Sequence, residues 1–124
     1  MKIFHHHIYE YKKGLRDLVL CTMDSANQLL IEQKLDLNNI AFIIWPLNNN
    51  KINVFFGHLS CVNVIKCFRK NSLQQLTVEE DFILGIMLGY NRTLQCERYL
   101  QRKKKATALA KIQYLTGHNK KWID

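Results

Sequence analysis

The sequence contains little that would interrupt a folded core and no run long enough to cross a membrane. It has only 1 proline and 5 glycines in 124 residues, which argues against a disordered or linker-rich chain. The most apolar run, residues 82–90, is far shorter than the roughly 18 residues of a membrane span. His5, His6 and His7 interrupt any signal-peptide pattern at the start. We therefore expect one cytoplasmic domain, residues 1–124, without a membrane partner.

Several chemical signatures are also missing. The four cysteines form no CxxC pair, and a hydrophobic fraction of 48% allows a core without disulfides, so free thiols are the simplest prediction. Glycine-rich phosphate loops, a nucleophile elbow and a zinc-protease helix are absent as well. We assign no catalytic residue, expect no cofactor, and favour a protein that is not an enzyme.

Positive charge is abundant but local. The net charge is +8, and the segment from Arg98 onward has eight Lys or Arg against Asp124, which gives +7. The other 97 residues carry ten Lys or Arg against nine acidic residues. A local basic field attracts an acidic protein, a nucleic acid or an anionic surface. The predicted partner-binding residues are Arg98, Arg102, Lys103, Lys104, Lys105 and Lys111.

The order of elements predicts an α+β fold. Residues 2–9 are aromatic and β-branched, which favours a strand, although a helix also fits. Helices are expected over about 12–22 and 24–34. Residues 40–45 and 52–56 are strand-like and are separated by Pro46 and three asparagines, which predicts a β-hairpin. The N-terminal strand and this hairpin would form a three-stranded sheet.

About five helices are expected to pack against that sheet. Ser60 can begin a helix that runs to about residue 69. Thr77 and Glu80 form a capping box, and the apolar helix that follows should run unbroken to about residue 103. A last helix over 106–115 should stop near Gly117. The basic C-terminal segment, about 98–124, is thus expected to be helical.

Three stretches resemble the DUF2023 family of uncharacterised small bacterial proteins. They are residues 6–16, residues 52–57, and residues 76–85 with the continuation Gly89-Tyr90 and 95–99. The resemblance implies three strands, five helices and a homodimer. It implies no activity, but relatives are often encoded near flavodoxins, which makes an acidic flavodoxin a candidate partner.

Two further sets of residues have both a structural and a functional interpretation. Imidazoles and thiolates bind transition metals, so His5, His6, His7, His58 and Cys61 are candidate metal or haem ligands. Structural histidines and a small buried cysteine are the alternative. A thiolate at Cys61 would be stabilised by the N-terminus of its helix. Gly85 and Gly89 are four residues apart on one predicted helix, which fits either packing within the chain or a dimer interface.

The function hypotheses follow from these sites. The first is a non-catalytic, homodimeric interaction protein that docks an acidic partner through its basic C-terminal surface, where complementary charge accelerates encounter. The second is nucleic-acid binding through the same residues, although no helix-turn-helix, zinc-finger or RNP motif is present. The third is a metal or haem protein that uses the histidines.

Overall fold

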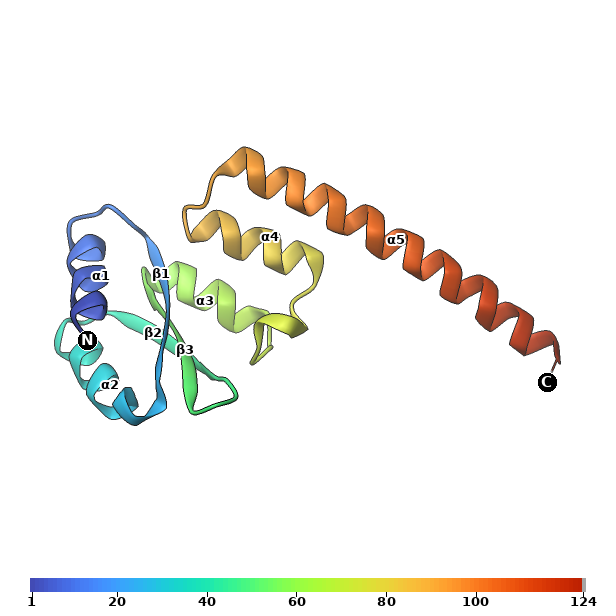
Figure 1. Ribbon diagram of the computed structural model, residues 1–124. Coiled ribbons are helices and arrows are strands. Elements are labelled where there is room, and N and C mark those ends of the chain that lie inside the picture. Colours follow the sequence, from blue (N-terminus) through green and yellow to red (C-terminus); the bar gives the residue numbers. More distant parts are fainter. Residues whose placement is uncertain (124) are drawn as a thin grey trace.

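The protein is an α+β domain built on one three-stranded antiparallel sheet (Figure 1). The computed structural model describes the backbone of residues 1–123 and the side chains of residues 1–116. The strands are β1 (Leu18–Asp24), β2 (Ala41–Pro46) and β3 (Lys51–Gly57), in the order β1-β3-β2. The helices of the described chain are α1 (Lys2–Lys12), α2 (Gln28–Leu37), α3 (Leu59–Cys67), α4 (Val78–Met87) and α5 (Arg92–Ile123), with short 3₁₀ turns at Ser25–Asn27 and Leu73–Gln75.

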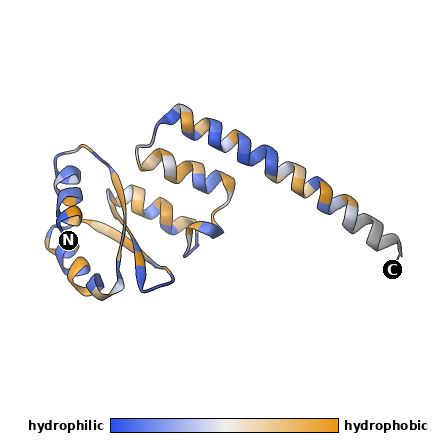
Figure 2. Cartoon of the chain, viewed as in Figure 1, coloured by the Kyte–Doolittle hydropathy of each residue, from blue (hydrophilic) through white to orange (hydrophobic). Residues whose placement is uncertain are grey.

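Helices cover both faces of the sheet. On one face α1 and α2 pack on Val54 and Phe56 of β3, and on the other α3 and α4 pack on Phe55. The alternation of side chains along a strand separates these two cores. Figure 2 shows the apolar residues gathered on the strands and on the inner faces of the helices. The fold class and the three-stranded sheet are therefore as the sequence predicted.

The first two predicted elements are wrong in type. Residues 2–12 form helix α1, not a strand, and it buries Phe4 and Ile8 one turn apart. The predicted helix over 12–22 is instead strand β1. Both faces of β1 are covered, so its apolar run is continuous and lacks the alternation that marks a half-exposed strand. The sheet's third strand therefore comes from residues 18–24.

The central hairpin is confirmed. Its turn places Asn49 and Asn50 at φ 61° and 57°, the left-handed region that asparagine tolerates. Pro46 ends β2, as expected for a residue that cannot donate to a ladder. The helix after the hairpin is capped by His58, whose Nδ1 accepts from the amide of Ser60 at 3.1 Å, and not by Ser60 itself.

The helix after the Thr77–Glu80 capping box is shorter than predicted. The box is present, but α4 ends at Met87 and a second helix, α5, begins at Arg92. The chain reverses between them, so the two helices lie side by side (Figure 1). The predicted last helix is part of α5, which continues without a break through Gly117. Beyond α4, α5 projects away from the rest of the molecule.

Candidate docking surface on α5

The inner side of α5 is attached to α4 by ion pairs. Arg98 Nε and Arg102 Nη1 each lie 3.1 Å from Asp81 Oδ2. Lys103 Nζ lies 2.9 Å from Glu79 Oε2, which also accepts a hydrogen bond from the Tyr99 hydroxyl at 2.9 Å. Three of the six predicted partner-binding residues therefore already have acidic partners within the chain.

These contacts shift the pKa values of the groups that make them. Hydrogen bonds from Lys103 and Tyr99 lower the pKa of Glu79. The hydrogen bond and charge of Asp81 raise the pKa of Arg98, and Glu79 raises the pKa of Lys103. Each shift favours the charged form of its group. The inner side of α5 is thus electrostatically satisfied and offers little net charge to an outside partner.

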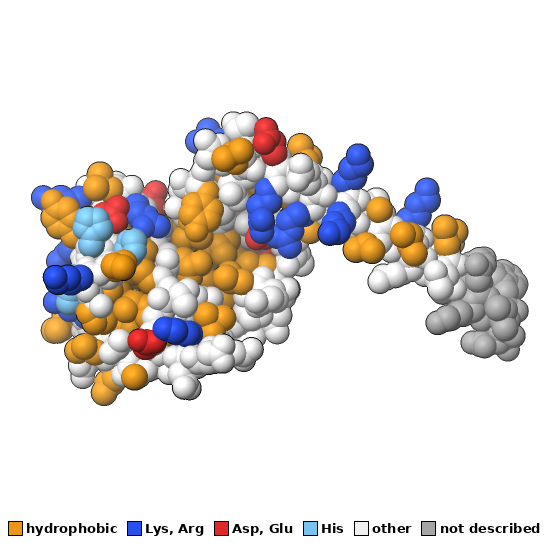
Figure 3. All heavy atoms as spheres, viewed as in Figure 1, with side chains coloured by type: hydrophobic (Ala, Val, Ile, Leu, Met, Phe, Trp, Pro, Cys, Tyr) orange, Lys and Arg blue, Asp and Glu red, His pale blue; other side chains and the backbone are white. Residues whose placement is uncertain are grey.

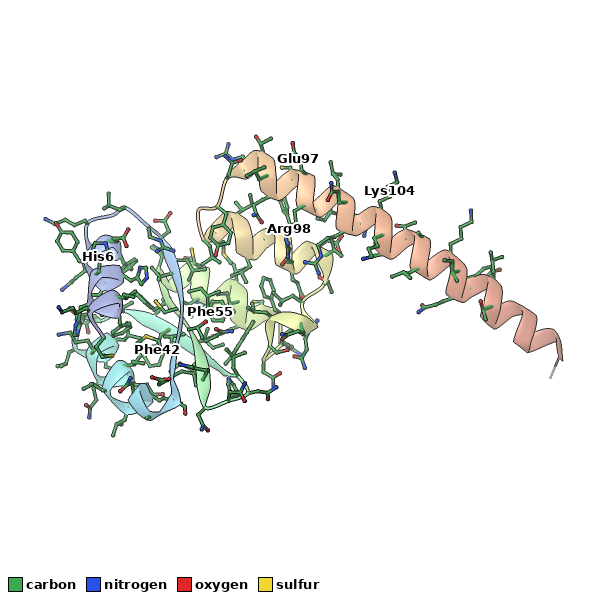
Figure 4. The ribbon with its side chains drawn as sticks, viewed as in Figure 1. His6, Phe42, Phe55, Glu97, Arg98 and Lys104 are labelled. Carbon is green, nitrogen blue, oxygen red and sulfur yellow. The ribbon has the colours of Figure 1, made fainter. Side chains whose placement is uncertain are left out.

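Of the other three predicted residues, Lys104 and Lys111 lie on the side of α5 turned away from α4, whereas Lys105 follows Arg98 by seven residues and lies at the flank of the helix, beyond the ion pairs. Lys104, Lys105 and Lys111 are exposed and form no ion pair among residues 1–116. Figure 4 shows Arg98 directed toward α4 and Lys104 directed away from it. Residues 104, 108, 111 and 115 follow spacings of four and three, so they share one helix face. That face holds two of the three unpaired lysines, Lys104 and Lys111.

Apolar side chains accompany these lysines. Leu109, Ile112 and Leu115 are 53%, 60% and 53% exposed. Figure 3 shows basic and apolar side chains alternating along this part of α5. We define the α5 outer face as the exposed lysines and large apolar residues that follow the ion pairs with α4 along the helix: Lys104, Lys105, Lys111, Leu109, Ile112 and Leu115. A helix of this composition combines long-range attraction for an acidic surface with apolar area to bury on contact.

Sequence reasoning missed the acidic half of the α4–α5 contact. Glu79 and Asp81 were visible as acidic residues in the first turn after the capping box. Their pairing with residues 17 to 24 positions later depends on the chain reversal before α5, which the sequence analysis did not predict. Two nearby residues in the sequence indicate that reversal: Gly89 is a residue type that commonly ends helices, and Asn91 is a type that commonly caps the start of one.

The three N-terminal histidines lie on α1. His7 Nδ1 is 3.3 Å from Glu10 Oε1 and 3.1 Å from Arg16 Nη1, and His6 Nε2 is 3.5 Å from the same glutamate oxygen. Within the described residues no group of three or more His, Cys, Asp or Glu side chains is arranged to hold a metal ion. The structure thus brings two of the histidines to one carboxylate.

His58 and Cys61 are on the opposite side of the sheet from these histidines. Phe4 and Ile8 of α1 pack in one core and Val62 and Ile65 of α3 pack in the other, so the five candidate ligands do not converge. Burial, with a smaller effect of Asp17, raises the pKa of Cys61. This is the reverse of the thiolate stabilisation expected at the start of that helix, because loss of solvation disfavours the charged form.

The two glycines have roles within one chain. A Cβ at Gly85 would overlap the amide end of the Gln95 side chain from α5, so the missing side chain leaves the space between the two helices that Gln95 occupies. Gly89, at φ +80°, ends α4: its amide donates to Ile86, and the amide of Tyr90 donates to Gly85, which is a Schellman motif. The proposed dimer interface at these glycines stays a prediction.

Comparison with known proteins identifies the family. Among the described residues, no helix combines the length and apolar character that crossing a bilayer would require. No curated protein matches the chain. The profile of a protein family of unknown function (DUF2023) matches residues 2–102, which includes α1 through the first part of α5. The chain belongs to the DUF2023 family.

Proposed function

We propose that this protein is a non-catalytic, homodimeric interaction protein that docks an acidic protein partner through the α5 outer face. One observation carries the proposal. Lys104, Lys105 and Lys111 have no acidic neighbour among residues 1–116, although Arg98, Arg102 and Lys103 on the same helix are all paired. The helix carries these free charges away from the folded body (Figure 1), where a partner has access from several directions.

The outer face favours a protein partner because it is not purely basic. A partner that contacted only the lysines would leave the three exposed apolar residues in water. A protein partner can bury them, which stabilises the complex by about 25 cal/mol per Å² of apolar area. The lysines would increase the association rate, and the apolar contacts would slow dissociation. A flavodoxin is the first acidic protein to test, since the family resemblance suggests it.

The test compares two triple variants of equal charge. Lys104, Lys105 and Lys111 are changed to Glu in one, and the exposed Lys2, Lys34 and Lys66 are changed to Glu in the other. Binding to a flavodoxin is measured by calorimetry at low and at high ionic strength. We expect wild-type binding that weakens with salt, loss in the α5 variant, and retention in the control. Equal weakening in both variants, or no binding by the wild type at low salt, contradicts the proposal.

Nucleic-acid binding by the same face is the second candidate. It is favoured by Tyr114, which is 68% exposed close to Lys111 and offers a ring on which a base can stack. It predicts that affinity for random single-stranded DNA falls steeply and linearly with the logarithm of the salt concentration. A gel shift that detects no complex at low salt excludes it, and a complex that tolerates the Tyr114→Ala substitution removes the stacking role.

A further inference from the structure

In the part of the chain that the structure describes, strand β1 has a hydrogen-bonding partner on one side only. The strand order is β1-β3-β2, so β1 is an edge of the sheet. Its register with β3 is continuous from Leu18 to Asp24, which means that no bulge interrupts it. Residues 18–23 contain no proline and no charged residue. Proline, charge and bulges are the devices by which natural edge strands avoid pairing with another chain. Residues 18–23 have none of them, and the one charged residue of β1, Asp24 at its end, is paired with Lys51.

The hydrogen bonds at the ends of β1 show which backbone groups are free. The amide of His58 donates to the carbonyl of Asp17, and the amide of Ser25 donates to Asn50, each at 2.8 Å. Both pairs share the β1–β3 register, and hydrogen-bonded pairs alternate along an antiparallel ladder. The backbone amides and carbonyls of the odd-numbered residues of β1, Val19, Cys21 and Met23, therefore bond to β3. The amides and carbonyls of Leu20 and Thr22 point outward and have no partner among residues 1–116.

A groove follows this free edge. One depression, of about 370 Å³, is lined by residues 20–24 of β1 and by Ile3 and His7 of α1. A second, of about 260 Å³, shares Leu20 and is walled by Leu88 and Tyr90. A third shares those two residues and reaches Arg16. Each depression thus shares a lining residue with the next, and Figure 3 shows apolar side chains gathered between α1 and α4.

Arg16 supplies a cation at one end of the groove. It is half-buried, its Nη1 lies 3.1 Å from His7 Nδ1, and it forms no ion pair with a carboxylate among residues 1–116. Asp24, at the other end of β1, is already paired with Lys51. Glu10 and Asp17 line the same depression, but neither forms an ion pair with Arg16, so the Arg16 guanidinium can still pair with a carboxylate on an incoming chain.

We propose that the groove along β1 binds an extended peptide segment of a partner protein by β-strand addition, with an acidic side chain of that segment paired to Arg16. Free backbone groups two residues apart are matched by an extended chain, which repeats every two residues at about 7 Å. A helix satisfies its own backbone and cannot meet them. A second copy would bring its own α1 and α4 against the same walls, whereas a single strand enters between them.

The first experiment measures amide hydrogen exchange in the free protein. We expect slow exchange for Val19, Cys21 and Met23, which donate to β3, and fast exchange for Leu20 and Thr22. Slow exchange at Leu20 and Thr22 in the monomer would show that the edge is already covered and would overturn the proposal.

The second experiment uses an array of blocked octapeptides that alternate Val, Ile or Thr with polar residues. Each peptide is made in three forms. The first has Glu at one end or the other, the second has Gln in place of that Glu, and the third lacks the Glu but has a free C-terminal carboxylate. We expect the wild-type protein to bind Glu peptides best. N-methylation at alternate peptide residues should weaken binding about tenfold, the effect of losing one to two hydrogen bonds. No binding by any peptide, indifference to N-methylation, or preference for the free carboxylate contradicts the proposal.

Two matched pairs of variants locate the binding. Thr22→Pro removes an outward amide that β3 does not use, and Thr22→Val keeps that amide while removing the hydroxyl. Circular dichroism confirms that each variant is folded. We expect peptide binding to be lost in Thr22→Pro and kept in Thr22→Val. We expect the preference for Glu peptides to be lost in Arg16→Gln and kept in Arg16→Lys.

Unchanged binding in Thr22→Pro overturns the proposal. So does wild-type self-association that Thr22→Pro abolishes, because a second copy would then occupy the edge. The α5 triple variant should bind peptides normally, which separates this site from the proposed docking face.

Discussion

Gly57 lies at the end of β3, next to Asp17, the residue that precedes β1. Its φ is +151°, and a Cβ there would overlap the carbonyl oxygen of Asp17. Any side chain at this position must therefore displace the linker between α1 and β1. Gly57→Ala is expected to lower the free energy of unfolding by about 3 kcal/mol, from backbone strain and the steric overlap together.

Chemical denaturation monitored by circular dichroism measures this effect. Gly14→Ala is the matched control, since Gly14 also has a positive φ, +77°, but nothing lies within 4 Å of the position of its Cβ. Its cost should be limited to the left-handed conformation, about 1–2 kcal/mol. Equal destabilisation by the two substitutions would show that the contact with Asp17 has no role.

Glu79 makes the attachment of α5 to α4 sensitive to acid. Its pKa is lowered in the folded protein by Lys103 and Tyr99, so its contribution to stability is present above its ordinary pKa and is lost as the pH falls through the folded value. Glu79→Gln should reduce the Tm slightly at pH 7, because the pair is exposed and surface pairs are weak. The difference from wild type should be smaller at pH 3, below the ordinary glutamate pKa of about 4.3, than at pH 7.

The control for this prediction is Glu97→Gln. Glu97 is on α5, is directed away from α4 in Figure 4 and is in no ion pair among residues 1–116. Its Tm should stay close to that of wild type at both pH values. A Glu79 effect that is as large at pH 3 as at pH 7 would mean that the residue acts through packing, not through its charge.

The residue pattern correctly predicted the central hairpin but gave the wrong type for the first helix, and both outcomes have a physical reason. Asparagine's tolerance of the left-handed region correctly marked the hairpin turn, because that preference is local. The aromatic and β-branched content of residues 2–9 favoured a strand, yet the spacing of Phe4, Ile8 and Tyr11 was the better signal. Those three side chains contact the core at helical intervals, and burial outweighs the small difference in intrinsic propensity.

At the scale of elements, the division between α4 and α5 decides which charges are free. A single helix over 78–103 would have placed Asp81 and Arg98 more than four turns apart. The Schellman end at Gly89 and the start of α5, where the amide of Leu94 donates to Asn91 Oδ1 at 3.0 Å, bring them into contact. The sequence contained both signals, but the apolar periodicity of residues 83–94 suggested continuity across them.

Asn91→Ala tests the start of α5. Loss of the cap should cost about 1 kcal/mol of unfolding free energy, measured by denaturation, without changing the fold. Asn91→Asp and Asn91→Ser retain a capping oxygen and should restore most of that stability. If Ala is tolerated as well as Asp and Ser, the cap does not contribute, and the contacts of α5 with α4, which include the Phe82–Tyr99 ring pair as well as the ion pairs, hold α5 in place.

At the scale of the whole molecule, the structure divides the charge that the sequence showed as one block. The α4 carboxylates neutralise the first part of the basic segment, and α5 carries the next lysines beyond the body. The site could be predicted from composition only as far as its location on the C-terminal segment. Which lysines are free depends on a tertiary contact. The groove along β1 could not be predicted at all, because β1 itself was assigned to a helix.

The projecting part of α5 gives the last prediction. A helix without a packed face is marginal in water, and Leu109, Ile112 and Leu115 are more than half exposed. Amides of residues 111–116 should therefore exchange faster than those of residues 95–103, which pack on α4. Addition of an acidic partner that binds the α5 outer face should slow exchange at 111–116 and leave 95–103 unchanged, because binding supplies the missing packing. Protection confined to 95–103 would instead place the partner on another surface. The α5 triple variant, mixed with the same partner, should show no added protection at 111–116.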